Sequence, residues 1–325
     1  MSGLALKGAS WLTVRQYRRT LWLTAAVVAL SFLVVAGLRL WDAQTPDSLT
    51  ADGMRVPAND TGHALLREAM LQGVVGMLLL PLLVGAFVAG PLIAREFESG
   101  THKLSLTQSL SPTAWLRTKL LVTTAAALLA TLALMGVFRI GWGRVSGGWN
   151  LTWADRGPYE SSGVVLVAYV LAAVAVGALI GLLVRRTLVA MATTGLVLGV
   201  LLLVLGALRW SFLPVETYVK NGPASGLPND AFLVHTGMLT RDGSRFDPWT
   251  CRSEAMDATR NVDVPDLWIK TYDGCLARHD VVSEFVDYHP RSHFWPTQLI
   301  ESGIVLALAG LALYAAFRVL RARHP

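Results

Sequence analysis

The residues best suited to chemistry lie close together in the C-terminal part of the chain. They are the metal-binding types His279, Asp280, Asp287, His289 and His293. The last two have the i, i+4 spacing that would bring both imidazoles to one helix face, but Pro290 interrupts such a helix. No glutamate completes the His-Glu-x-x-His pattern of a zinc protease. The pattern therefore favours a solvated loop over a metal site.

Both cysteines, Cys251 and Cys275, lie in this same polar part of the sequence. Thiols that face an oxidising compartment usually pair, whereas thiols in a reducing cytosol usually stay free. The distribution of basic residues along the chain places the segment outside the cell. The sequence therefore favours a disulfide over two free thiols.

Nucleotide hydrolysis is not expected of this chain. A loop that cradles ATP phosphates ends in Gly-Lys-Ser/Thr, yet no lysine in the sequence follows a glycine. All seven histidines lie outside the apolar runs, so a base or metal for hydrolysis within a membrane is also missing. We assign no catalytic, cofactor-binding or metal-binding residue and do not expect an enzyme.

Composition and apolar runs indicate a membrane protein. Hydrophobic residues make up 53% of the chain and charged residues only 15%, whereas soluble domains carry about 25% charged residues. A bilayer core needs roughly 20 apolar residues in a helix. Six runs lack Asp, Glu, Lys and Arg: Leu21–Leu38, Ala69–Ala94, Leu120–Phe138, Ser161–Val184, Thr187–Leu208 and Ser302–Phe317.

Basic residues set the expected orientation, because they concentrate on the cytoplasmic side of a membrane. The segments on one side contain only two acids, Glu96 and Glu98. Their basic residues are Lys7, Arg15, Arg18, Arg19, Arg95, Lys103, Arg117, Lys119, Arg185, Arg186, Arg318, Arg321 and Arg323. We therefore expect both termini in the cytoplasm.

The spans divide the chain into four expected regions. Residues 1–20 form a cytoplasmic N-terminal segment, in which Ser10 caps an interfacial helix, Trp11–Thr20, or in which the residues are an ordinary basic flank. Residues 21–208 hold the first five spans with a cytoplasmic loop at 95–119. Residues 209–296 form an extracytoplasmic domain with a short helix at Ser253–Arg260. Residues 297–325 hold the sixth span and a basic tail.

The uncharged spans also bear on the energy source. A proton- or ion-coupled carrier keeps ionisable side chains within its spans as a coupling site. Because the six runs have none, energy for a transport step would have to come from a partner outside the bilayer.

The loop at 95–119 carries the most specific pattern. It contains Arg95-Glu96-Phe97-Glu98-Ser99-Gly100-Thr101, then Leu104-Ser105-Leu106-Thr107-Gln108-Ser109, and then Trp115-Leu116-Arg117-Thr118-Lys119-Leu120. These motifs closely resemble the loop between the second and third spans of type-2 ABC exporter permeases, especially the actinobacterial branch. The opening Trp11-Leu12-Thr13-Val14-Arg15-Gln16-Tyr17-Arg18 resembles the N-terminal connecting helix of that branch.

The resemblance implies a dimer of six-span subunits, either a homodimer or a pair with a related permease. Cytoplasmic ABC ATPase subunits would dock on this loop and hold ATP and Mg²⁺, so this chain itself would carry no cofactor. The residues expected to couple ATPase to permease are Arg95, Glu96, Phe97, Glu98, Gly100, Thr101, Lys103, Leu104 and Leu106.

Together these patterns predict an all-α polytopic membrane protein with six transmembrane helices and both termini cytoplasmic. A disulfide-closed external domain would lie between the fifth and sixth helices. The predicted function is the permease of an ATP-driven exporter of an apolar or amphipathic substrate, in the bacterial cell membrane and in contact with lipid. The alternatives are a non-transporting scaffold or sensor and, third, a membrane-embedded enzyme. No nucleic-acid partner is expected.

Overall fold

The computed structural model describes residues 18–44, 48–49, 55–56, 61–100, 111–147, 151–220, 228, 230–260, 264 and 266–323. The chain divides into two compact units. The helical unit comprises Met1–Phe212 and Trp295–Pro325, and the inserted unit comprises Leu213–Phe294. The predicted N-terminal helix, Trp11–Thr20, lies almost wholly outside the described residues.

Six of the described helices are long and apolar enough to cross a membrane, which confirms the predicted number of spans. The candidate spans are Arg18–Asp42, Thr61–Glu98, Pro112–Val145, Val165–Val184, Thr187–Ser211 and Arg291–Ala322. The helices extend beyond most of the uncharged runs because a helix continues until a cap or turn ends it. At Pro112, for example, the hydroxyl of Ser111 accepts the Ala114 N–H at 3.2 Å and proline occupies the first turn.

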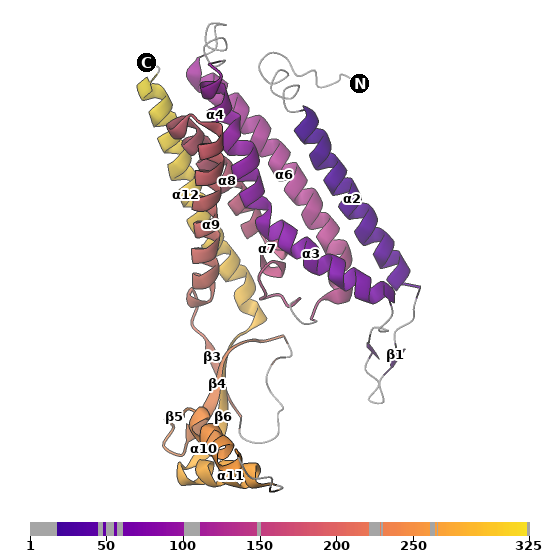
Figure 1. Ribbon diagram of the computed structural model, residues 1–325, viewed down its shortest axis with the longest axis vertical. Coiled ribbons are helices and arrows are strands. Elements are labelled where there is room, and N and C mark those ends of the chain that lie inside the picture. Colours follow the sequence, from indigo (N-terminus) through magenta and orange to yellow (C-terminus); the bar gives the residue numbers. More distant parts are fainter. Residues whose placement is uncertain are drawn as a thin grey trace. The chain divides into compact units, whose positions relative to one another are not determined.

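The helical unit contains several short elements besides these long helices. Its elements are α2 (Arg18–Asp42), β1 (Ser48–Leu49), β2 (Arg55–Val56), α3 (Thr61–Leu83), the π-helical η1 (Val84–Ala89), α4 (Gly90–Glu98), α6 (Pro112–Val145), α7 (Pro158–Ser162), α8 (Val165–Val184), α9 (Thr187–Leu208), η2 (Arg209–Ser211) and α12 (Phe294–Arg323). β1 and β2 form an antiparallel pair. Figure 1 shows that the start of α2, the end of α4 and the end of α12 lie at one end of the unit.

Helix α8 forms the centre of the helical unit. In its most apolar stretch 72% of the residues are buried, against 6% in α2, which lies at the edge of the bundle. Two glycines of α8 allow the second span to approach closely. A Cβ on Gly177 would lie 2.6 Å from the Cβ of Ala89, and one on Gly181 would lie 2.8 Å from the carbonyl oxygen of Gly90. Small residues at such contacts are typical of helices packed within membranes.

The second span is interrupted where it passes α8. Pro81 lies inside α3 and removes one backbone hydrogen bond, and the π-helical turn η1 follows. Figure 1 shows α3 and α4 meeting at a bend. This bend allows α3 to pack on α2 and α6, while α4 packs on α8 and α9.

The fourth span begins later in the structure than the sequence predicts. The uncharged run begins at Ser161, but Ser161 and Ser162 end the separate short helix α7, and α8 begins only at Val165. A Cβ on Gly163 would overlap the side-chain amide of Gln298, so a larger residue here would displace the Gln298 side chain. The run of uncharged residues could not show this break, because glycine and serine occur in both helices and turns.

The inserted unit contains a four-stranded antiparallel sheet in the order β3-β6-β4-β5. Its elements are β3 (Glu216–Lys220), β4 (Phe232–Thr240), β5 (Arg245–Phe246), α10 (Trp249–Thr259), α11 (Leu267–Arg278) and β6 (Val281–His289). The all-α prediction is therefore wrong for this unit. The pairing of β3 with β6 joins residues as far apart as Glu216 and Tyr288, which no local pattern in the sequence reveals.

Helices α10 and α11 are joined by the disulfide Cys251–Cys275, whose Cα atoms lie 5.5 Å apart. Both cysteines are fully buried. The disulfide predicted from the sequence is confirmed, and α10 contains most of the predicted helix Ser253–Arg260.

Asp287 is the buried charge of the sheet. Arg245 donates to its carboxylate at 2.7 and 3.2 Å, and the hydroxyl of Thr217 donates at 2.6 Å. Burial opposes ionisation, but the hydrogen bonds from Thr217 and Arg245 outweigh it, so the pKa of Asp287 lies below its ordinary value. Asp287 thus connects β6 to both β3 and β5.

Replacing both cysteines by serine should loosen the inserted unit and leave the spans intact. In the chain-entropy account, closing a loop of this length contributes about 3 kcal/mol. Amide hydrogen exchange of α10 and α11 in the purified full chain should accelerate accordingly, while α8 stays protected. Equal exchange in the variant and the wild type would show that the disulfide contributes nothing to the fold of this unit.

The Asp287 carboxylate predicts acid sensitivity of the sheet. Because its pKa is lower in the folded chain, its contribution is present near neutral pH and is lost as pH falls through the folded pKa. Asp287→Asn should lower the stability of β6 by about 1 kcal/mol at pH 7 and remove this part of the pH dependence. Hydrogen exchange of β6, corrected for the intrinsic rate at each pH, measures both effects. An unchanged pH profile in the variant would contradict the assignment.

Candidate functional site

The last turn of α4 carries the residues expected to contact a partner. The Ser99 N–H donates to the Arg95 carbonyl at 2.9 Å, and Gly100 follows with a φ of +71°, a conformation that glycine adopts without strain. Arg95 and Glu98 are exposed on this turn, whereas Glu96 is buried. The turn therefore has a charged outer face and a charged inner face.

The inner face is held by an ion pair. The Lys119 ammonium donates to Oε1 of Glu96, and the two residues are only 4% and 8% exposed. The Lys119 nitrogen also lies 5.1 Å from the centroid of the Trp115 ring, a cation–π contact. Lys119 and Trp115 lie one turn apart on α6. The pair therefore attaches the end of α4 to the start of α6.

Neighbouring contacts join the same turn to the connection between α8 and α9. The ring of Phe97 lies edge-on to Trp115 at 6.3 Å between centroids, and the Arg185 guanidinium lies 5.2 Å from the centroid of Phe97. Glu98 accepts the backbone N–H of Thr187, the first residue of α9, at 2.9 Å and the hydroxyl of Thr187 as well. A carboxylate is favourable at a helix N-terminus. The end of α4 is thus fixed to α6 and α9.

The structure brings the first part of the predicted coupling segment together. These residues are Arg95, Glu96, Phe97, Glu98 and Gly100. The rest of the predicted set lies outside the described residues: Thr101, Lys103, Leu104 and Leu106. Within the described part, Arg95 and Glu98 offer charge to a partner, while Glu96 acts inside the protein.

Sequence reasoning did not assign roles to four residues that hold this end of the bundle. They are Trp115, Lys119, Arg185 and Thr187. Trp115 and Lys119 have i, i+4 spacing within one motif, which was an available signal that they share a helix face. The partner of Thr187 had no such signal, because it lies 89 residues away at Glu98.

A second polar cluster lies at the other end of α9. The Arg209 guanidinium donates to Glu301 at 2.8 and 3.0 Å and to Glu160 at 2.5 Å. It also stacks over the Tyr159 ring at 3.8 Å, and the Tyr169 hydroxyl donates to Glu301 at 2.6 Å. Arg209, Glu160 and Glu301 are no more than 2% exposed. We call Arg209, Glu160, Glu301, Tyr159 and Tyr169 the Arg209 cluster.

The Arg209 cluster corrects the prediction that the spans lack charged side chains. Glu301 lies inside the sixth candidate span, and Arg209 lies in the last turn of the fifth. A bilayer excludes isolated charges but tolerates those that are paired inside a bundle. The uncharged runs ended at these residues, but the structure extends the spans past them because each charge has a partner.

The histidines and acids of the inserted unit do not converge on a metal-ion site. Nδ1 of His289 lies 3.0 Å from Nδ1 of His293, while Asp287 binds Arg245 and Thr217. Over the described part of the chain, no group of three or more His, Cys, Asp or Glu side chains has a metal-binding arrangement.

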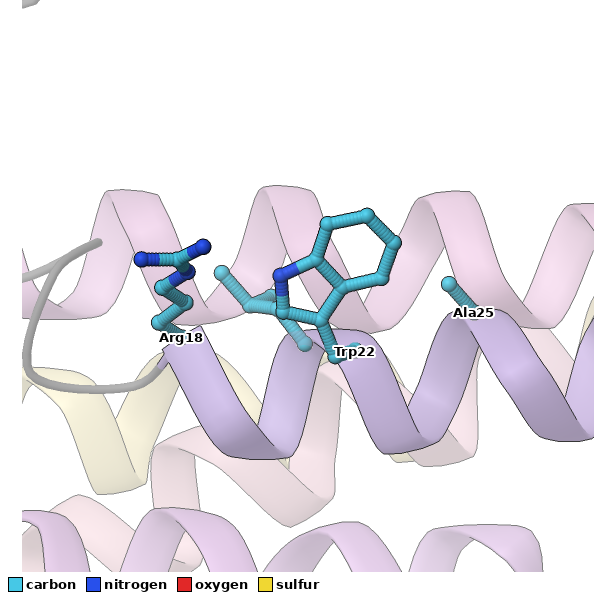
Figure 2. Close-up of a pocket in the computed structure, with 4 residues that line it drawn as sticks. Arg18, Trp22 and Ala25 are labelled. Carbon is cyan, nitrogen blue, oxygen red and sulfur yellow. The ribbon is translucent and has the colours of Figure 1, made fainter.

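A hollow on the surface of α2 is lined by Arg18, Leu21, Trp22 and Ala25. Figure 2 shows the Arg18 and Trp22 side chains standing on the same face of this helix. Trp22 is 66% exposed. These four lining residues are an arginine and three apolar side chains, with no nucleophile or general base among them.

The six apolar helices and their paired internal charges define a multi-pass membrane protein. The model of the ABC-2 membrane transporter related family matches residues 21–209, more than half of the chain, and the chain belongs to this family. The match supports an ABC transporter permease, a membrane component of transport. It ends at Arg209, before the inserted unit. A search of curated proteins found no match.

Removing one partner of the Glu96–Lys119 pair should destabilise the helical unit far more than removing both. Glu96→Gln or Lys119→Met alone leaves a buried charge, at a cost of about 3–5 kcal/mol. The double variant should recover most of this loss. The measurement is a double-mutant cycle: the free energy of unfolding in mixed detergent micelles of the wild type, the two single variants and the double variant. Arg117→Gln, an exposed neighbour, should change it by less than about 0.5 kcal/mol. Additive losses in the double variant would refute the pairing.

Proposed function

We propose that this chain is the permease subunit of an ATP-driven ABC exporter in the bacterial cell membrane. The observation that carries the proposal is the fixation of the end of α4. Its outer face presents Arg95 and Glu98, while its inner face is bound to α6 through Lys119 and to α9 through Thr187. A partner that displaced this turn would therefore move the second, third and fifth spans together as a rigid body.

The proposed partner is a pair of cytoplasmic ABC ATPase subunits docked on residues 95–119. The sequence lacks a Gly-Lys phosphate loop, so ATP and Mg²⁺ would be held by these subunits. The resemblance of the loop to actinobacterial exporters and the family match support this partner. The same resemblance supports a permease dimer, formed by two copies of this chain or by one copy and a related permease.

The proposed topology places both termini and the end of α4 in the cytoplasm. Its support is the excess of Lys and Arg in those segments. The inserted unit would then lie outside the cell, where its disulfide is stable.

The proposed substrate class is apolar or amphipathic. Many of the apolar side chains on the spans are exposed in the single subunit, among them Leu79, Phe87 and Leu203. In a membrane such surfaces face lipid, a second subunit or a lipid-like substrate.

The test is copurification followed by coupling. The full chain should copurify with an ATPase, and its reconstituted complex should hydrolyse ATP. Reversing both exposed charges, Arg95→Glu with Glu98→Lys, should weaken ATPase docking about tenfold, equivalent to about 1.4 kcal/mol. The measurement is the ATPase concentration needed for half-maximal ATP turnover.

Two control variants isolate the docking effect. Glu68→Lys reverses an exposed charge on α3 and should leave turnover unchanged. Thr187→Val removes the hydroxyl that donates to Glu98 but keeps the backbone N–H donor and the charge, so it should reduce turnover less than the double reversal. Absence of any ATPase partner would overturn the permease proposal and favour a non-transporting scaffold or sensor.

A further inference from the structure

Holding helices together through the Arg209 cluster carries a large desolvation penalty. Its guanidinium and two carboxylates are withdrawn from solvent, with exposures of 1% for Arg209, 2% for Glu160 and 0% for Glu301. Desolvation of such groups costs several kcal/mol each, and apolar residues of similar volume often stabilise a fold as well or better. The cluster therefore calls for an explanation beyond stability.

The cluster joins four separate elements, three of them through Arg209 and the fourth through Glu301. Arg209 follows α9, Glu160 lies in α7, Glu301 lies in α12, and Tyr169 of α8 donates to Glu301. Gln298 of α12 adds two further links, because it accepts the Val165 N–H at 2.9 Å and donates to the Tyr159 carbonyl at 2.8 Å. If Arg209 moved, the end of α9 would lose its contacts with α7 and α12, which Gln298 would still join to each other.

Charged contacts differ from apolar contacts when water enters. Separated apolar side chains remain exposed at a cost that grows with their area. A separated guanidinium and carboxylate regain hydration, which offsets the ion pair that was lost. The Arg209 cluster can therefore exist either with its ion pairs formed and water excluded, or with its charged groups separated and hydrated. An apolar cluster strongly favours the state from which water is excluded.

We propose that Arg209 is the positioning residue of a water-openable gate at this end of the spans, which is the outer end in the proposed topology. In the closed state it holds α7 against α9 and α12, and in the open state its partners separate into water to release substrate. This role as a gate rests on the proposed function as an exporter. The bound arrangement described above is the closed state.

Two kinds of substitution should act in opposite directions. Arg209→Gln leaves Glu160 and Glu301 buried together without a cation, so the gate should open. The triple variant Arg209→Met, Glu160→Gln and Glu301→Gln removes every charge and should keep the gate closed, because opening then gains no charge hydration. Glu160→Gln alone leaves a balanced Arg209–Glu301 pair and is the matched control.

Thiol labelling reports the state of the gate without any partner protein. Ser161 of α7 is fully buried and can be replaced by the similar-sized cysteine. The native cysteines are joined in a disulfide, so the introduced thiol is the reactive one. The full-length chain in lipid nanodiscs exposes both membrane faces to a water-soluble maleimide, which makes the measurement independent of orientation. A Ser244→Cys variant, at an exposed position, gives the rate for an open site.

In the Ser161→Cys background we expect Arg209→Gln to raise the labelling rate at least tenfold. The triple variant should label at least threefold more slowly than the parent, and Glu160→Gln should not exceed it. If Arg209→Gln fails to fold, the triple variant decides. Labelling of a folded triple variant at or above the parental rate would overturn the gate. Because no ATPase is present, this result is separate from a failure of the exporter proposal, which would show as a missing partner.

Discussion

Charge withdrawn from water must be paired, and this constraint fixes how the helices of this protein meet. Among the described residues the buried charged side chains are Asp42, Glu96, Lys119, Glu160, Arg209, Asp287 and Glu301. Each forms an ion pair with a group of opposite sign. At the end of α2, for example, Asp42 binds Arg144 of α6 at 2.8 Å and His63 of α3 at 3.1 Å. The ion pairs therefore specify which helix ends lie together, while apolar packing fills the space between them.

The sequence predicts the spans well because their signal is local. A bilayer demands about 20 apolar residues in a row, and such runs are visible without knowing what they contact. The disulfide was predictable for a related reason, since the compartment and the presence of only two cysteines limit the choices. In contrast, Arg209 lies 92 residues from Glu301 and 49 from Glu160. Charge alone could not select these partners from the other charged residues of the chain.

The absence of a local signal for long-range contacts also explains why the sequence prediction did not separate the roles of Glu96 and Glu98 and missed the strands of the inserted unit. Glu96 and Glu98 look equivalent in the sequence, but a helix turns about 100° per residue, so residues two apart face different directions. Glu96 consequently meets Lys119 inside the bundle, and Glu98 reaches Thr187 at the surface. The strands of the inserted unit were missed because β3 and β6 pair only after the intervening chain has folded back.

Helix α9 connects the two ends of the proposed mechanism. It begins at Thr187, which is bound to Glu98, and the Arg209 cluster follows its last residue, about 33 Å away at 1.5 Å per residue. A continuous helix is stiff over this length, so displacement of its first turn moves its last turn. The contact at Thr187 lies at the surface, where a partner can reach it, whereas the contacts of Arg209 are buried and break only when water enters. Motion would therefore begin at the α4 end, and the Arg209 cluster would set the threshold for opening.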